Sequence, residues 1–239
     1  MTQGNDYDDE RLHKAVEQWN SVVGKRLLRS LTPIYREGPR HPELIGSGTL
    51  LRIADMTFLV TAAHVADEVK RGPYYFGAAD MLIPLGGLKM SSPLPVGVSR
   101  DEDRTDLAYW VLDPSVAGKL SSADTLRPGD LELDSVSEAF TENQYLVNGY
   151  PASRQPRRLT EGEFAARPFS FITEEESARS YEAINLDRTR NLFVSFDKDD
   201  TYRQGAKVTG PDLFGISGCG FSKFCRSFSL NSVALRTVC

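Results

Sequence analysis

The sequence predicts an all-β protein built from antiparallel barrels or sandwiches. Three observations favour this class: short apolar runs of strand length, frequent turn signals, and no alternation of strands with helices. The chain has 19 Gly and 13 Pro among its 239 residues, which is typical of many turns and therefore of many short strands. Strands that follow one another without intervening helices favour antiparallel sheets.

One long helix is predicted, near the N-terminus over residues 8–30. Acidic residues lie at its start and basic residues near its end, as the helix dipole prefers. Its apolar residues recur at helical spacing and are Leu12, Val16, Trp19, Val23 and Leu27. We expect an amphipathic helix that packs on the body of the protein, and we assign residues 1–32 to an N-terminal helical extension.

Short strands are expected from about residue 33 onwards. A hairpin is predicted where residues 46–53 and 57–61 flank the turn Ala54-Asp55-Met56. Further strands are predicted at 81–85, 94–98, 107–112, 144–147, 169–173, 191–196 and 206–209. Residues 113–140 are the least strand-like interior stretch, which places the connection between two β units there.

Composition narrows the partners and the compartment. The net charge of −5 disfavours nucleic acid or an anionic membrane as the main partner, and no apolar run is long enough to span a membrane. The polar, acidic start does not have the pattern of a signal peptide. The three cysteines, all in the last 21 residues, do not form a disulfide framework. We therefore expect a cytoplasmic protein.

Three short motifs offer the groups that a nucleophilic serine needs: a base, a group that orients the base, and donors for an oxyanion. His64 lies in LVTAAHV, where small residues let the imidazole occupy a crowded junction. Asp106 opens the apolar strand LAYWVL, a position where a carboxylate can be half-buried. Ser217 lies in GISGCG, and Gly215 lets the backbone turn so that the N–H groups of Gly215 and Ser217 face one point.

Each motif alone is weak, because such residues more often have structural roles in turns and caps. Their joint order, His then Asp then Ser, is more specific. With GSGTLL at 46–51, LVTAAHV at 59–65, TDLAYWVL at 105–112, NGYP at 148–151 and GISGCG at 215–220, the chain resembles the trypsin-like (chymotrypsin-fold) serine peptidases. Without an export signal it is similar to the intracellular bacterial members.

The resemblance implies two six-stranded antiparallel β-barrels with the site in the cleft between them. It places a first barrel at 33–121, the inter-barrel connection at 122–139 and a second barrel at 140–239. It further implies that His64 is the general base and then acid, that Asp106 orients it, and that Ser217 is the nucleophile. The N–H groups of Gly215 and Ser217 would form the oxyanion hole. The substrate would be a protein or peptide, cleaved through an acyl-enzyme without a metal or organic cofactor.

The chain also departs from the family pattern. Ile216 stands where the family usually carries Asp or Asn, so activation by insertion of a new N-terminus is not expected. Pro211 stands where trypsin-type members bind basic side chains, so a preference for Lys or Arg is not predicted. Only residues 218–239 follow Ser217, fewer than the closing strands of the second barrel require. We expect that barrel to be incomplete, through truncation, through divergence, or because another chain completes it.

Two functions of different class remain open from the sequence. The first is a serine endopeptidase with the triad His64, Asp106 and Ser217. The second is a peptidase-fold protein that no longer cuts and serves as a binding or scaffold module. An esterase of the α/β-hydrolase type is disfavoured by the order of the three residues. A regulatory protein partner is expected for a cytoplasmic protease with an incomplete site.

Overall fold

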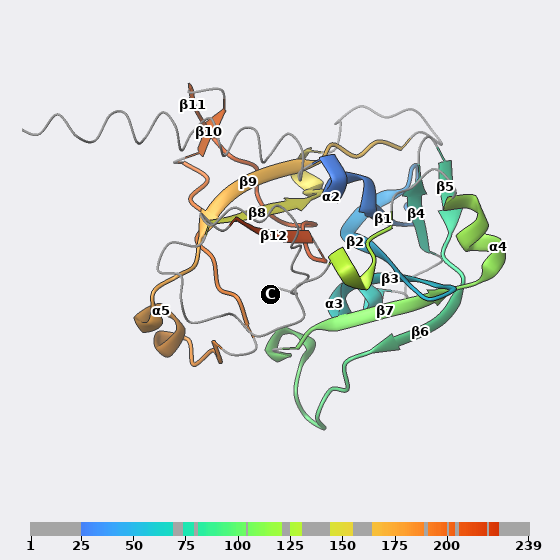
Figure 1. The fold of residues 1–239 in the computed structure, drawn as a ribbon, viewed down its shortest axis with the longest axis horizontal. Coiled ribbons are helices and arrows are strands. Elements are labelled where there is room, and N and C mark those ends of the chain that lie inside the picture. The colour runs from blue at the N-terminus through green and yellow to red at the C-terminus, as the bar shows by residue number, and fades with distance from the viewer. Residues whose placement is uncertain are drawn as a thin grey trace, which may run out of the picture.

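The protein consists of two β units that lie side by side (Figure 1). The computed structural model describes residues 25–68, 74–78, 81–103, 105–120, 125–130, 144–154, 164–188, 191–199, 201–203, 206–218 and 220–224. Antiparallel strands dominate this part of the chain and its helices are short. The structure confirms the all-β class that the sequence predicts.

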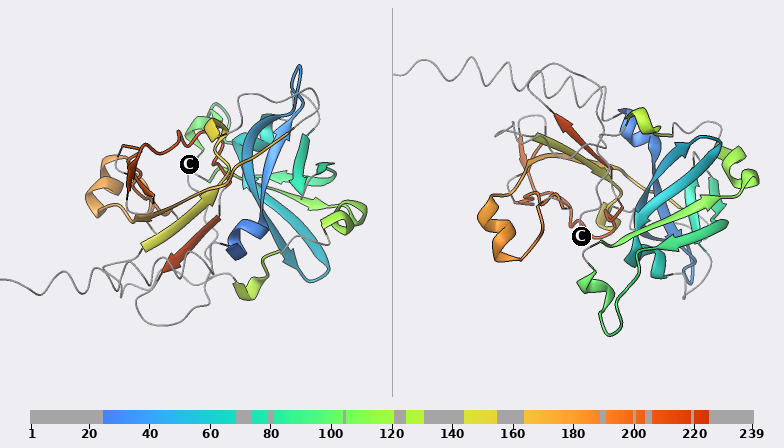
Figure 2. Two further views of the ribbon diagram at one scale, coloured as in Figure 1. Left: turned by 90° about the horizontal axis from the view of Figure 1, so that it is seen from above. Right: turned by 60° about the horizontal axis from the view of Figure 1, so that its bottom comes forward.

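The first unit is a seven-stranded antiparallel sheet that curls around its own core (Figure 2). Its strands are paired in the order β5-β4-β1-β2-β3-β7-β6. They are β1 (Leu31–Arg36), β2 (Glu43–Ile53), β3 (Met56–Ala62), β4 (Tyr74–Ala78), β5 (Met81–Pro84), β6 (Gly87–Ser91) and β7 (Leu107–Leu112). The hairpin predicted around residue 54 is the β2–β3 pair.

Alternation along the strands explains how this sheet buries one face. In β7, Ala108, Trp110 and Leu112 point into the core, while the residues between them are only partly buried. Leu50 and Leu59, which are directly paired across β2 and β3, join the same core. The burial of these side chains supplies the main driving force for folding of the unit.

The second unit contains a three-stranded sheet in the order β12-β8-β9 and a separate hairpin. Its strands are β8 (Gln144–Gly149), β9 (Phe169–Glu174), β10 (Thr201–Arg203), β11 (Ala206–Val208) and β12 (Gly220–Phe224). The central strand β8 is buried on both faces. Tyr145 and Val147 pack into the core of the second unit, while Leu146 packs toward the first. The expectation that the second barrel is incomplete concerns the chain after residue 224, which lies outside the described residues.

The helices are short and lie at the ends of strands. They are α2 (Lys25–Ser30), α3 (Ala63–Asp67), α4 (Pro114–Ala117) and α5 (Ala178–Ala183), with the 3-10 turns η3 (Arg100–Glu102), η4 (Gly118–Leu120), η5 (Pro128–Asp130) and η6 (Ala152–Arg154). Of the helix predicted over residues 8–30, the structure describes α2 alone. Leu27 of α2 is fully buried with Leu51 and Leu146, and so joins the two β units.

Two predicted strands are wrong. Residues 94–98 form a loop, because Pro95 has no N–H for a ladder and Gly97 has a positive φ of 85°; the strand of this region is β6, seven residues earlier. Residues 191–196 contribute a single bridge between Val194 and Glu175, because the Phe193 N–H donates to the Tyr181 hydroxyl instead. The strands β1, β4, β6 and β10 were not predicted. The predicted domain boundaries stay a prediction.

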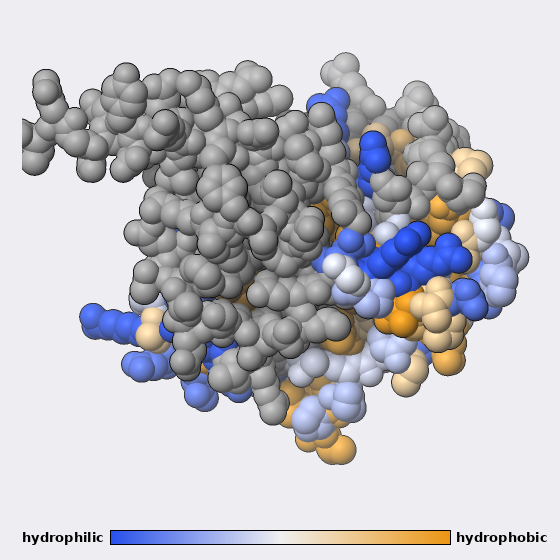
Figure 3. Space-filling model, viewed as in Figure 1, coloured by the Kyte–Doolittle hydropathy of each residue, from blue (hydrophilic) through white to orange (hydrophobic). Residues whose placement is uncertain are grey.

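Apolar side chains on the described surface gather over β6 and the loop that follows it (Figure 3). Leu88, Met90 and Val96 are the large exposed residues of this region. β6 is the last strand in the order of the sheet, so these side chains lie at a sheet edge. They are separate from the cavity described below, which β6 does not line.

Candidate active site

His64 lies where β3 runs into α3, as the second residue of that helix. Ala62 and Ala63, directly before it, are completely buried, so the turn from strand to helix packs tightly against the sheet. The His64 side chain itself is 44% exposed. The small residues therefore place the imidazole at the surface of a cavity, at the junction that the sequence predicts.

Asp106 directly precedes β7, the neighbour of β3 in the sheet. Its side chain is only 2% exposed, so it is buried rather than half-buried as the sequence suggested. One carboxylate oxygen accepts the backbone N–H of His64 at 2.8 Å, and the other lies 2.5 Å from Nδ1 of the same residue. A carboxylate at Nδ1 keeps the proton on that nitrogen and leaves Nε2 as an acceptor.

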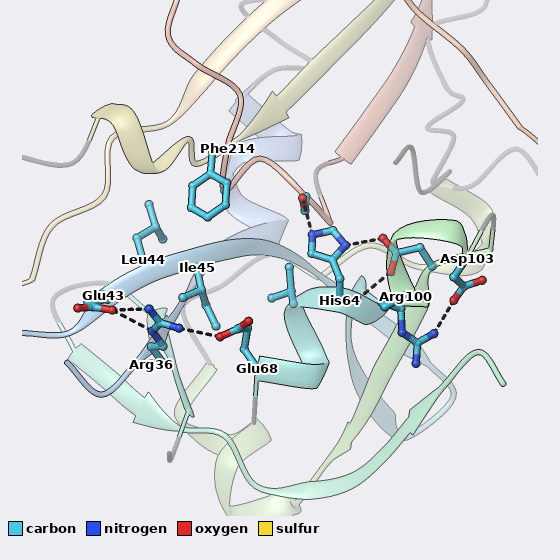
Figure 4. A pocket seen from close by; sticks show the side chains of 13 residues that line it. Arg36, Glu43, Leu44, Ile45, His64, Glu68, Arg100, Asp103 and Phe214 are labelled. Carbon is cyan, nitrogen blue, oxygen red and sulfur yellow. Dashed lines mark hydrogen bonds and ion pairs between the residues drawn. The ribbon is translucent and has the colours of Figure 1, made fainter. Parts of the chain in front are cut away.

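Ser217 completes a chain of hydrogen bonds (Figure 4). Its Oγ lies 2.9 Å from His64 Nε2, on the loop between β11 and β12. The structure thus brings together the three residues that the sequence singled out, although 153 positions separate Ser217 from His64. The arrangement allows the imidazole to accept the hydroxyl proton of the serine.

Gly215 has a backbone conformation that favours glycine. Its φ is +87°, and a Cβ there would lie 2.9 Å from the backbone nitrogen of Ala152. The carbonyl of Phe214 accepts the Ala152 N–H at 2.7 Å, so the N–H of the Phe214–Gly215 peptide points away from Ala152. No described group accepts a hydrogen bond from the N–H of Gly215 or Ser217. Both are thus suited to an external acceptor.

The sequence analysis missed Ser47, a fully buried residue of β2 that holds the Ser217 loop. Its N–H donates to the Ser217 carbonyl at 2.8 Å, and its hydroxyl donates to the Gly215 carbonyl at 3.1 Å. The same hydroxyl accepts the N–H of Tyr150 at 2.8 Å. Ser47 therefore links the first unit to two segments of the second. GSGTLL gave no local signal of this role.

Ile216 anchors the Ser217 loop from the opposite side. Its side chain packs against the second core, which contains Tyr145, Val147 and Leu192. An apolar contact thus occupies the place where the family resemblance leads one to look for an acid. Ser47 thus holds the carbonyls of Gly215 and Ser217, and the side chain of Ile216, the residue between them, holds the loop to the core of the second unit.

A cavity of about 750 Å³ adjoins these groups. Leu44, Ile45 and Phe214 supply apolar surface, and Phe214 is 75% exposed. Arg36 lies between Glu43 and Glu68, with nitrogen–oxygen distances of 2.8 and 2.6 Å (Figure 4). The hydrogen bond to Glu43 is the main cause that raises the pKa of Arg36. The cavity is large enough for side chains of a peptide and is open beside His64.

Asp212 does not line this cavity. Its side chain is largely exposed and pairs with Lys198 at 3.2 Å. The described residues therefore give no support for recognition of Lys or Arg through Asp212.

Those same residues contain no group of three or more His, Cys, Asp or Glu side chains that could hold a metal ion. None of their helices is long and apolar enough to cross a membrane.

Solved structures include chains of similar fold, whereas the other two comparisons found no match. No protein-family model matches the chain, and no curated protein matches it. Among solved structures the chain is similar to neuropsin, a serine protease expressed in the limbic system of mouse brain. The two share 16% sequence identity over 83% of each chain, with a TM-score of 0.48. At this score the similarity assigns neither an activity nor a substrate to the chain.

Proposed function

We propose that the protein is a chymotrypsin-like serine endopeptidase that hydrolyses peptide bonds through an acyl-enzyme. One observation carries the proposal: the continuous hydrogen-bonded chain from Asp106 through His64 to Ser217. Structural ion pairs between histidine and aspartate are common. A serine hydroxyl on the other ring nitrogen, at the edge of an open cavity, is what nucleophilic catalysis requires.

In the first half of the proposed reaction, Ser217 Oγ attacks the carbonyl carbon of the scissile bond. His64 Nε2 takes the hydroxyl proton as the new C–O bond forms. Asp106 keeps the ring in the required tautomer and stabilises the imidazolium. The N–H groups of Gly215 and Ser217 donate to the oxyanion, where fixed donors contribute most to the rate.

In the second half, the imidazolium gives its proton to the leaving amine as the C–N bond breaks. Water then enters, His64 removes one of its protons, and the hydroxide formed attacks the acyl carbon. The Ser217 oxygen leaves with the proton held on His64. Each proton is returned, so the cycle consumes only peptide and water.

A fluorophosphonate probe tests the proposal, because it labels an activated serine covalently. We expect the wild-type protein to be labelled, and Ser217→Ala and His64→Ala to be unlabelled. Ser91→Ala, which alters an exposed serine of β6, serves as a matched control and should label normally. A folded but unlabelled wild-type protein would favour the alternative of a binding or scaffold module.

Peptide hydrolysis is tested separately from serine activation. We expect the labelled protein to cleave an unstructured protein substrate, as followed by mass spectrometry. Cleavage of a simple ester without any cleavage of peptides would overturn the peptidase assignment. A regulatory protein partner is also part of the proposal. Full activity of the isolated monomer on the same substrate would count against the need for such a partner, and not against the peptidase assignment. The cytoplasmic location and the bacterial type stay predictions.

A further inference from the structure

Arg100, a residue of η3 that lines the cavity, joins the helix that carries His64 to a neighbouring loop. Its Nε donates to Asp67 of α3 at 2.8 Å, and its Nη1 donates to Asp103 at 2.5 Å. The Arg100 side chain is 17% exposed and that of Asp103 is 7% exposed. The charge-assisted bond to Asp103 is therefore less weakened by solvent than the bond to Asp67, whose side chain is 37% exposed.

Asp103 connects Arg100 to Asp106. Its carboxylate accepts the N–H of Thr105 at 3.0 Å, and it also accepts the N–H of Asp106. Asp106 has a positive φ of 34°, which is costly for a residue with a Cβ. The Asp103 carboxylate therefore holds the turn that points the Asp106 side chain at His64.

Ser92 closes the network on the side of the sheet. Its hydroxyl donates to Asp103 at 2.7 Å, and its N–H donates to the carbonyl of Leu107 at 2.7 Å. Burial alone opposes ionisation of Asp103, but the hydrogen bonds from Ser92, Thr105, Asp106 and Arg100 outweigh it and lower its pKa. Asp103 is thus a carboxylate at neutral pH, and Arg100 is its cation.

We infer that Arg100 is a positioning residue for the proposed reaction. It fixes α3, which carries His64, relative to the loop that carries Asp106, and so sets the alignment of the imidazole with its carboxylate. The inference rests on the proposed function. Arg100 is assigned no contact with the reacting atoms, and its effect passes through Asp67 and Asp103.

The charges around His64 give the inference a signature in pH. Asp106 contacts the ring, Asp67 is the last residue of the helix that carries His64, and Glu68 directly follows that helix. Lys89 of β6 lies 3.8 Å from Asp67, and Arg36 pairs with Glu68 on the other side of α3. Removal of the Arg100 charge leaves an excess of carboxylate near the ring, which favours the imidazolium. Removal of the Asp67 charge has the opposite effect.

The experiment measures the rate constant of fluorophosphonate labelling from pH 5 to 9 in two variants. Arg100→Gln and Asp67→Asn both break the tie, so both should label about 10- to 100-fold more slowly, the loss that misplacement of reacting groups causes. The pH of half-maximal rate should rise in Arg100→Gln and fall in Asp67→Asn. Arg100→Lys retains the charge and should restore the wild-type midpoint with part of the rate.

Arg188→Gln is the matched control, because Arg188 pairs with Glu175 at 2.7 Å but does not line the cavity. It should label as the wild type does. Wild-type rates in both test variants would overturn the inference. The inference would also be overturned if both variants lost labelling rate together with thermal stability while their pH midpoints stayed at the wild-type value, since that result indicates a structural role alone.

An NMR titration of the His64 ring keeps the inference distinct from the proposed function. If the wild-type protein is not labelled, the proposed function fails, while the ring midpoints of wild type, Arg100→Gln and Asp67→Asn still report the coupling. Opposite shifts in the two variants would support it. Unchanged midpoints would overturn it. Asp67→Asn leaves the bond from Arg100 to Asp103 in place and so remains usable if Arg100→Gln does not fold.

Discussion

The two β units hold their parts of the site in different ways. In the first, His64 and Asp106 lie at the ends of β3 and β7, which are adjacent and in register from Phe58↔Val111 to Ala62↔Leu107. In the second, Ser217 lies on a loop outside any strand. That loop is held by Ser47 of the first unit and by the Ile216 side chain.

The two parts of the site are therefore positioned by different parts of the structure. The pair of His64 and Asp106 is set within one sheet, so its geometry follows from the ladder and from the tie through Arg100. The position of Ser217 depends on the junction between the two units. We therefore expect variants of the first unit to change proton transfer, and variants of the junction to change the alignment of the nucleophile and the oxyanion donors.

Asp106→Asn should have the largest effect, because it acts on the pair within the first unit. The amide cannot hold the imidazole in the required tautomer, and the rate should fall about 10⁴-fold. The labelling rate constant and the thermal melting curve measure the two parts of this expectation. A folded variant that reacts within tenfold of wild type would show that Asp106 does not orient His64.

Gly215→Ala tests the loop of the second unit. A Cβ would approach the Ala152 nitrogen at 2.9 Å, at a φ of +87°, so the peptide before Gly215 must turn and its N–H must move. Loss of one oxyanion donor should lower kcat about 10²- to 10³-fold. Gly97→Ala is the control, since Gly97 has a φ of +85° but no atom within 4 Å of the added Cβ. Equal effects in the two variants would contradict the assigned donor.

Ser47→Ala tests the junction. It removes the hydroxyl that binds the Gly215 carbonyl and the Tyr150 N–H, which leaves buried polar groups unpaired. The free energy of unfolding should fall by about 1–3 kcal/mol, and kcat should fall by roughly tenfold with little change in KM. Denaturant titration and steady-state kinetics measure the two effects, with Ser91→Ala as the control. A loss of stability without any loss of kcat would limit Ser47 to a structural role.

Asp103→Asn should have the smallest effect on stability, and that effect should depend on pH. The folded pKa of Asp103 is lowered by its hydrogen bonds, whereas an unfolded Asp titrates near about 3.9. Its charge thus stabilises the fold above that value and loses its contribution as pH falls through the folded pKa. Denaturation at pH 7 should show a less stable variant, with the difference decreasing toward pH 3. Asp55→Asn, in the exposed β2–β3 turn, is the control.

Local sequence patterns singled out the residues whose local structure is determined by their neighbours in the sequence. LVTAAHV, TDLAYWVL and GISGCG singled out His64, Asp106 and Ser217, each at a strand end or a glycine turn, and the structure brings these three side chains together. The roles of these residues in catalysis stay a prediction. The apolar run LAYWVL likewise predicted β7 with its bounds.

Roles that depend on distant partners could not be predicted in this way. Ser47 binds a residue 168 positions away, and nothing in its own motif indicates this. In the sequence, Arg100 is one charged residue among several in a polar stretch. Its proposed positioning role depends on Asp67 and Asp103, which meet it only in the folded protein. The strand predicted at 191–196 failed for the same reason, since a buried tyrosine hydroxyl takes one of its backbone groups.

The contact of Ile216 with the second core carries no charge. Neither salt nor a change of ionisation can break this contact. It is stabilised by the entropy of the water that leaves the apolar surfaces, and no ion takes part in it. No newly cut amine is needed to order the loop. In the proposed enzyme, the loop that carries Ser217 is therefore ordered once the two units are folded and joined through Ser47, without an activating cleavage.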